Sequence, residues 1–157
     1  MEYTSQKSID LNSINYTVPD RICISDACEF GMGGLDDLGN SWRYALPEDL
    51  QGIFSINLLE FIAAILTIKM VIRNKRKDSV LKILSLTDSS SALGWMYKSS
   101  FNPLNYPLHD VVARHMATNL MENNTSLYSQ HISGKRNVVA DSLSRDHHII
   151  KNKLSLN

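Results

Sequence analysis

The segment Ile53 to Ile72 limits the folds open to this chain more than any other part of its sequence. It is apolar on nearly every side when drawn as a helix, and the cationic stretch Arg73 to Lys77 follows it. It also contains Asn57, Glu60 and Lys69, which hydrocarbon would disfavour, so we do not expect it to span a membrane. We expect a buried helix packed against a sheet, with the cations near its negative C-terminal end.

Length and composition are those of one globular domain. The chain has 157 residues, of which 43% are hydrophobic, enough for one core. Residues 1–20 are predicted to be a polar leader or linker remnant, 21–146 the folded domain and 147–157 a polar tail. Sixteen basic residues balance sixteen acidic ones, so any nucleic-acid contact must come from local clusters. The spacing of Cys23 and Cys28 does not suit a zinc site, and no signal peptide is evident, which favours an intracellular protein, cytoplasmic or nuclear.

The order of hydrophobic runs and turn residues indicates an α/β fold. The glycines at 31, 33 and 34 suggest a turn or bulge where backbone passes closely. Three strands in a meander, followed by alternating helix and strand, predict a mixed sheet with helices packed on its faces. The predicted strands are 21–27, 32–38, 41–46, 80–87 and 126–132, and the predicted helices are 56–74, 90–99, 108–121 and a last one that Asn137 could cap.

Four carboxylates occur where ordinary core packing does not favour them: Asp26 within a strand, Glu60 in the apolar helix, Asp88 at a strand end and Asp141 in the last helix. Phosphodiester hydrolysis needs an activated water and neutralisation of developing charge, which two Mg²⁺ ions about 4 Å apart can supply. Mg²⁺ requires oxygen ligands, and Mn²⁺ accepts them too. The four acids are therefore candidate metal ligands.

Glu60 carries the strongest physical argument. Its helical neighbours include Ala63 and Ala64, so it lies on a small-residue face that can approach a sheet closely. If Asp26 and Asp88 lie on adjacent central strands, all three acids converge, and the last helix could bring Asp141 to their edge. Each acid also has an ordinary interpretation. Asp26 could be an exposed strand end, Glu60 a partner of Lys98 or Arg114, Asp88 a helix N-cap and Asp141 a solvated first-turn acid.

Four segments resemble the ribonuclease H domains of retroelement (retrotransposon) reverse transcriptase polyproteins. They are ISDACEFGMGG, INLLEFIAA, LSLTDSSSALGWMYKSSF and HISGKRNVVADSLSR, and they span Arg21 to Arg145. The resemblance implies a five-stranded mixed sheet, an antiparallel meander plus parallel strands, with helices on both faces. It implies hydrolysis of the RNA strand of an RNA/DNA hybrid with two Mg²⁺ ions. On that pattern Asp26, Glu60, Asp88 and Asp141 hold the metals, and His131 corresponds to a histidine that assists product release.

Hybrid recognition in such a domain would depend on shape, phosphates and 2′-hydroxyls, so no sequence specificity is expected. The family's basic protrusion has no clear equivalent here. Arg73 to Lys77 is a possible substitute, or simply a solvated helix end. A reverse transcriptase polymerase, encoded separately or lost, would be a partner. Candidate nucleic-acid contacts are Asn57, Ser89, Ser90, Ser91, Lys135, Arg136 and Asn137.

Three alternatives remain open at this stage. The fold class also supports DNA strand cleavage, as in integrase-like or resolvase-like nucleases, although the HISGKRNVVADSLSR ending argues against it. A catalytically inactive connection or binding module is the second, and retention of all four acids argues against it. The third is a remnant reading frame whose product is not made or does not fold alone.

Overall fold

The computed structural model describes residues 18–98 and 100–145. Most of the predicted leader and all of the predicted tail lie outside these residues, so the domain boundaries stay predictions. The strands are β1 (Arg21–Cys28), β2 (Gly31–Asp36), β3 (Ser41–Ala45), β4 (Leu81–Thr87) and β5 (Thr125–His131). The helices are η1 (Glu48–Leu50), α2 (Ile56–Arg73), α3 (Ser90–Trp95), α4 (Pro107–Glu122), η2 (Gly134–Arg136) and α5 (Val138–Arg145).

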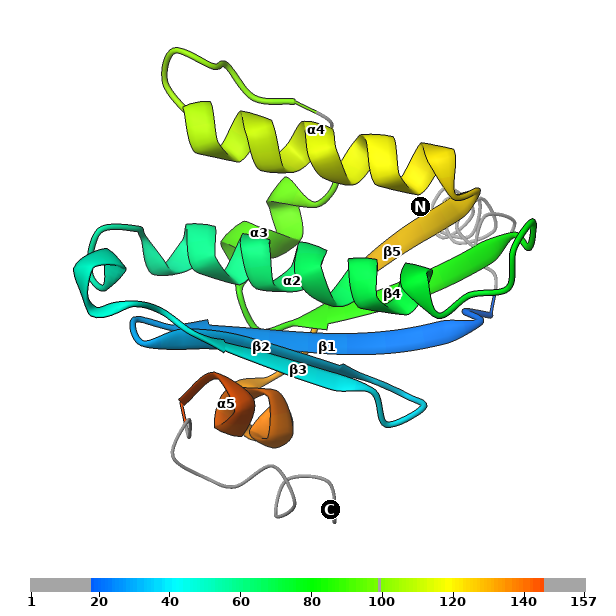
Figure 1. The fold of residues 1–157 in the computed structure, drawn as a ribbon, viewed down its shortest axis with the longest axis horizontal. Helices are drawn as coiled ribbons and strands as arrows, with labels where there is room; N and C mark the ends of the chain where they lie inside the picture. Colours follow the sequence, from blue (N-terminus) through cyan, green and yellow to red (C-terminus); the bar gives the residue numbers. More distant parts are fainter. Residues whose placement is uncertain (1–17, 99, 146–157) are drawn as a thin grey trace, which may run out of the picture.

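The five strands form one mixed sheet in the order β3-β2-β1-β4-β5 (Figure 1). β1, β2 and β3 pair antiparallel as a meander, whereas β1 pairs with β4 and β4 with β5 in parallel. The predicted five-stranded sheet is therefore confirmed. β1 lies in its centre, so side chains near the end of β1 are flanked by strands on both sides.

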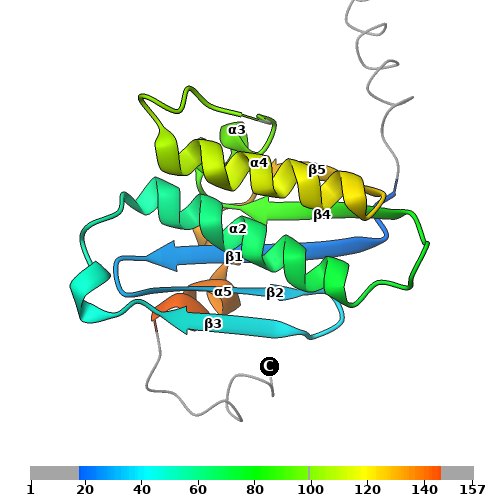
Figure 2. The ribbon, with the colours of Figure 1, turned by 45° about the horizontal axis from the view of Figure 1, so that its top comes forward.

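Helices cover both faces of the sheet, in three layers (Figures 1 and 2). α2, α3 and α4 lie on one face, and α5 lies alone on the other. The helix predicted at 90–99 is shorter than expected, because α3 ends at Trp95. Its N-cap is Ser89, whose side chain accepts a hydrogen bond from the Ala92 N–H, so Asp88 is not the cap.

α2 is the central packing element, as its apolar sequence predicts. Ser55 caps its first turn by accepting from the Leu58 N–H. Its fully buried residues Phe61, Ala63 and Ala64 face the sheet and the covering helices, and Phe61 contacts Trp95 of α3 edge-on at 5.7 Å. Within the described residues, no helix is both long enough and apolar enough to cross a membrane.

The glycines of β2 let helices approach the sheet on both faces, as their clustering suggested. A Cβ at Gly33 would lie 2.5 Å from the Leu143 Cβ of α5, and one at Gly34 would lie 2.0 Å from the Thr67 Oγ1 of α2. Both distances are shorter than real carbon contacts allow, so the two helices can seat only against glycine. This close seating brings α2 and α5 near the end of β1.

Candidate metal centre and catalytic site

Three acids from distant parts of the chain meet at one end of the central strands. Asp26 is near the end of β1, and Asp88 directly follows β4. The parallel register of β1 and β4 pairs Ile24 with Leu86, so continuing it by two residues brings Asp26 level with Asp88. Glu60 enters from the second turn of α2. The ligand oxygens of the three acids lie within 4.8 Å of one another, a spacing suited to a shared cation.

Burial makes this cluster unfavourable without a cation. Asp26 and Glu60 are each 4% exposed. Glu60 Oε1 accepts a hydrogen bond from the Ala27 N–H at 3.1 Å, but Glu60 Oε2 is buried without a partner among the described residues. Burial, followed by the charge of Asp26, raises the pKa of Glu60 to about 9. Burial also raises the pKa of Asp26 to about 6, against the hydrogen bond from Ser144. An orphaned carboxylate oxygen between two further acids fits a divalent metal ion.

The ordinary pairings considered for Glu60 are not formed. Arg114 makes its ion pair with Asp110 at 2.8 Å, and the Lys98 ammonium lies 5.0 Å from the centre of the Phe101 ring. Asp26 is buried, so it is not an exposed strand end either. No cation among the described side chains neutralises the cluster by a direct ion pair.

Asp141 lies at the rim of the site. It lines a cavity of about 360 Å³ together with Asp26, Glu60 and Asp88. It does not belong to the tight three-acid cluster, because its carboxylate is bound to Arg145, one turn later in α5, at 2.6 Å. Both side chains are about half exposed, so this ion pair is weak and can open. Asp141 is thus placed where it could add a fourth carboxylate.

An adjoining cavity collects four of the predicted nucleic-acid contacts. It has a volume of about 410 Å³ and shares Glu60 and Asp88 with the acid site. Asn57 from the first turn of α2 lines one side. Its other polar lining residues are Ser89, Ser90 and Ser91, at the start of α3. Ser89 Oγ accepts from the Ala92 N–H as the cap of α3 and keeps its hydroxyl proton, so Asn57 and all three serines can donate to a ligand.

The segment after β5 passes beside Asp88. His131 pairs with Thr87 in the sheet, and a Cβ at Gly134 would lie 3.4 Å from Asp88 Oδ2. His131 at the end of β5 and Lys135 and Arg136 after it are all exposed, so their side chains are accessible from solvent.

Asn137, a predicted nucleic-acid contact, is buried in the structure. It is 1% exposed, and its Nδ2 donates to the carbonyl oxygen of Ser25 in β1 at 3.1 Å. Its own carbonyl accepts from the Asp141 N–H, so it does begin α5, but through its backbone. The side chain instead fastens the start of α5 to the sheet, and burial excludes it from the surface.

Ser144 is a residue of the site that the sequence did not reveal. It is fully buried, and its Oγ lies 3.0 Å from Asp26 Oδ2 and 2.8 Å from the Asp141 carbonyl oxygen. A hydroxyl has one proton to donate, so it can serve only one of these acceptors at a time. A serine one turn after Asp141 on the apolar face of a short helix was the available signal. Ser144 links α5 to the central carboxylate.

Removing this hydroxyl is expected to weaken the metal site more than the fold. Ser144→Ala should reduce affinity for Mn²⁺ by about 10-fold, as loss of a group that orients a ligand usually does. Its cost to the free energy of unfolding should be about 1 kcal/mol. Calorimetric Mn²⁺ titration and thermal unfolding measure the two effects, with Ser41→Ala, at an exposed position of β3, as the control. Equal Mn²⁺ affinity in Ser144→Ala and wild type would contradict the role.

No protein-family model matches the chain, and no curated protein matches its sequence closely enough to indicate a relative. Solved structures do match. LC11-RNase H1 in complex with an RNA/DNA hybrid gives a TM-score of 0.62 at 20% identity, over 81% of this chain and 95% of that one. The N-terminal RNase H domain of Rv2228c from Mycobacterium tuberculosis, solved as a fusion with maltose binding protein, gives 0.59 at 16% identity, over 82% and 93%.

A viral protein extends the comparison. The foamy viral protease-reverse transcriptase in complex with an RNA/DNA hybrid gives a TM-score of 0.51 at 12% identity, and 85% of this chain aligns with 22% of that one. At such identities the likeness concerns architecture. Together with the strand order and the acid cluster, it establishes that this chain has a ribonuclease H-like fold.

Proposed function

We propose that this protein hydrolyses the RNA strand of RNA/DNA hybrids with two divalent metal ions. The observation that carries the proposal is the convergence of Asp26, Glu60 and Asp88, with ligand oxygens within 4.8 Å and Glu60 Oε2 left without a partner. Two of the similar structures, LC11-RNase H1 and the foamy viral enzyme, were determined with RNA/DNA hybrids. A substrate of the same kind is therefore the first to test.

The acids and His131 would have different roles in the reaction. Asp26, Glu60 and Asp88 would hold the metal ions, and Asp141 would complete the ligand set after leaving Arg145. Bound Mg²⁺ or Mn²⁺ would activate a water molecule and neutralise charge on the phosphate and the leaving oxygen. His131, exposed at the end of β5, would assist departure of the product.

The adjoining cavity would bind the hybrid. Asn57, Ser90 and Ser91 offer neutral donors and acceptors next to Glu60 and Asp88, a set suited to 2′-hydroxyls and sugar oxygens. Lys135 and Arg136, which follow Gly134 beside Asp88, would contact phosphates. Asn137 has no part in this proposal, since it is buried.

We also propose a reverse transcriptase setting, in which a polymerase domain on another chain or another segment helps to hold the hybrid. The sequence segments that resemble retroelement domains support it, as does the likeness to part of the foamy viral enzyme. The two described cysteines are both unpaired and buried, which suits a reducing compartment inside the cell.

The proposal is tested by incubating the purified full chain with a labelled RNA/DNA hybrid, double-stranded DNA or single-stranded RNA. Each substrate is incubated with Mg²⁺, Mn²⁺ or EDTA. We expect cleavage of the RNA strand of the hybrid alone, with either metal and not with EDTA. Cleavage of double-stranded DNA would indicate a DNA strand nuclease. Absence of cleavage by folded, metal-supplied protein that still binds hybrid would indicate an inactive binding module.

A further inference from the structure

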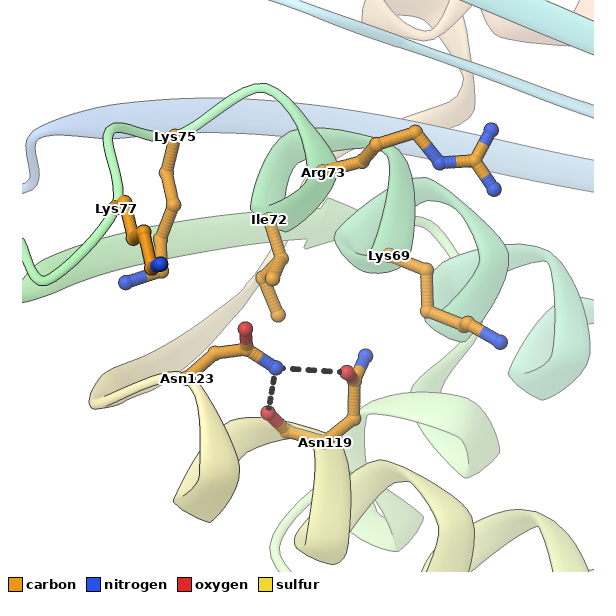
Figure 3. A pocket seen from close by; sticks show the side chains of 7 residues that line it. All are labelled: Lys69, Ile72, Arg73, Lys75, Lys77, Asn119 and Asn123. Carbon is orange, nitrogen blue, oxygen red and sulfur yellow. Dashed lines mark hydrogen bonds between the residues drawn. The ribbon is translucent and has the colours of Figure 1, made fainter.

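A further polar pocket lies far from the acid cluster, where the C-terminal ends of α2 and α4 come together (Figure 3). Its volume is about 400 Å³. Four cations line it from α2 and the turn that follows, and two amides line it from α4. They are Lys69, Arg73, Lys75, Lys77, Asn119 and Asn123, with Ile72 beneath them.

The positive charge of this pocket is not neutralised locally. Within residues 18–98 and 100–145, none of its four cations forms an ion pair. Lys75 Nζ donates to the Ser79 carbonyl, and Lys69 Nζ lies 2.9 Å from His115 Nε2. Neither partner carries a negative charge, so these contacts do not neutralise the ammonium groups. The nearest acids in sequence, Asp78 and Glu122, are exposed and do not line the pocket.

Helix ends do not account for this many cations. The C-terminus of each helix carries about half a negative charge, so the two helices together attract about one cation. Four cations line the pocket, and only Arg73 lies in the last turn of α2. Lys69 is one turn earlier, and Lys75 and Lys77 lie beyond the helix. A surplus of positive charge therefore remains for an external anion.

The amides suit the same kind of ligand. Asn123 Nδ2 donates to the backbone carbonyl and to Oδ1 of Asn119, which leaves the Asn119 amide nitrogen as a donor at the pocket (Figure 3). Neutral amide donors beside lysine and arginine are typical of contacts to nucleic-acid phosphates. A membrane surface would require exposed apolar residues among the cations, but the single apolar lining residue, Ile72, is only 7% exposed.

We propose that this pocket binds the phosphate backbone of the hybrid at a distance from the scissile bond. The inference rests on the proposed function for its choice of polyanion. Glu60 and Arg73 are thirteen residues apart on one helix, which corresponds to about 20 Å. Base pairs advance by about 3.4 Å, so a duplex running along α2 covers that distance in about six of them. The pocket would fix the position of the duplex relative to the acid site without touching the reacting atoms.

The test compares hybrids of two lengths. An 8-base-pair hybrid centred on the acid site extends about 14 Å to each side and does not reach the pocket, whereas a 24-base-pair hybrid extends about 40 Å and does. Binding of both to the full chain is measured by fluorescence anisotropy in EDTA, over a range of salt concentrations. Cleavage of both is measured separately with Mg²⁺.

Three variants isolate the charge of the pocket. The first, Lys69→Gln/Lys75→Gln/Lys77→Gln, removes three positive charges and keeps Arg73 at the helix end. The second, with arginine at the same three positions, keeps the charge. The third, Lys82→Gln, removes a cation from β4, where Lys82 alternates with the residues buried under α2.

For the glutamine variant we expect at least about tenfold weaker binding of the 24-base-pair hybrid near 0.1 M salt. The slope of log K against log salt should become shallower by about 2 to 3. Cleavage of the 8-base-pair hybrid, which reports only duplex held at the acid site, should not change, and the arginine variant and Lys82→Gln should resemble wild type. If wild type shows this length-dependent binding but cleaves neither hybrid, the pocket stands and the proposed activity fails.

Three results would overturn the pocket's role. The first is an unchanged affinity and salt slope for the 24-base-pair hybrid in the glutamine variant. The second is an equal loss of cleavage of the 8-base-pair hybrid, which would place the effect elsewhere. The third is thermal stabilisation of wild type, and not of the glutamine variant, by inorganic phosphate while hybrid binding is unaffected, which would assign the pocket to a small free anion.

Discussion

Replacing Asp26 with asparagine is expected to lower the rate of hybrid cleavage by about a thousandfold or more while the protein stays folded. Asp26 belongs to the three-acid cluster, and its carboxylate also accepts the hydrogen bond from Ser144. A metal ion contributes several kcal/mol to stabilising developing charge, and each 1.4 kcal/mol corresponds to a factor of ten in rate. Asparagine keeps the shape of the side chain but supplies no negative charge.

The fold should tolerate this change. Burial already disfavours the ionised form of Asp26, raising its pKa to about 6, so a neutral amide is not worse placed there in metal-free protein. Initial cleavage rates, Mn²⁺ titration and thermal unfolding would be measured together. Asp49→Asn, at an exposed position in η1, is the matched control and should behave as wild type. Full activity of folded Asp26→Asn would exclude a metal-ligand role.

Replacing Glu60 with glutamine is expected to abolish cleavage and, without metal, to stabilise the protein. The pKa of Glu60 is about 9 in the folded protein, against an ordinary value of 4.5. Between these two values the unfolded chain has lost a proton that the folded protein keeps, so the free energy of unfolding falls as pH rises from 4.5 to 9. Below pH 4.5 Glu60 does not lower the free energy of unfolding, and above pH 9 it lowers it by the full amount.

The variant should therefore unfold at a temperature higher than wild type by about 3–6 °C at pH 8 in EDTA, with little difference at pH 4. Added Mg²⁺ should reduce this difference in unfolding temperature between the variant and wild type, because Mg²⁺ favours the ionised Glu60 of wild type. Asp36→Asn is a control that should change the stability of the protein in the opposite direction. Although burial opposes it, hydrogen bonds from Asn40 and Leu38 and the charge of Arg21 lower the pKa of Asp36, so its loss should destabilise near neutral pH. A wild type more stable than Glu60→Gln at pH 8 in EDTA would contradict this account.

Most of the fold follows from local patterns. α2 begins and ends within a few residues of the predicted helix, because an apolar run bounded by Ser55 and a cationic stretch has few other solutions. Each predicted strand also forms. α3 is the main difference. Its predicted length assumed that 96–99 continue the helix, but the chain turns after Trp95, whose ring packs against Phe61 and Phe101. Such packing is set by partners distant in sequence.

The candidate site, like the fold, could be predicted from the sequence only in part. Asp26, Glu60 and Asp88 could be selected from the sequence because acids in strands and apolar helices are unusual. The sequence predicts Asn137 as a nucleic-acid contact like its neighbours Lys135 and Arg136, but its side chain turns inward to Ser25. Ser144 was not found, because its link to Asp26 joins residues 118 positions apart. Whether a polar residue faces solvent or a carboxylate depends on how α5 seats on the sheet.

The sequence alone determined which elements form and which acids are out of place, because periodicity, capping and residue type act over a few neighbours. Only the tertiary structure decided how they meet. The parallel register of β1 and β4 aligns Asp26 with Asp88, and the glycines of β2 let α2 and α5 approach closely enough to add Glu60 and Ser144. The basic pocket, too, exists only because α2 and α4 end side by side. These are long-range distances, fixed by strand order and close packing, which no local pattern encodes.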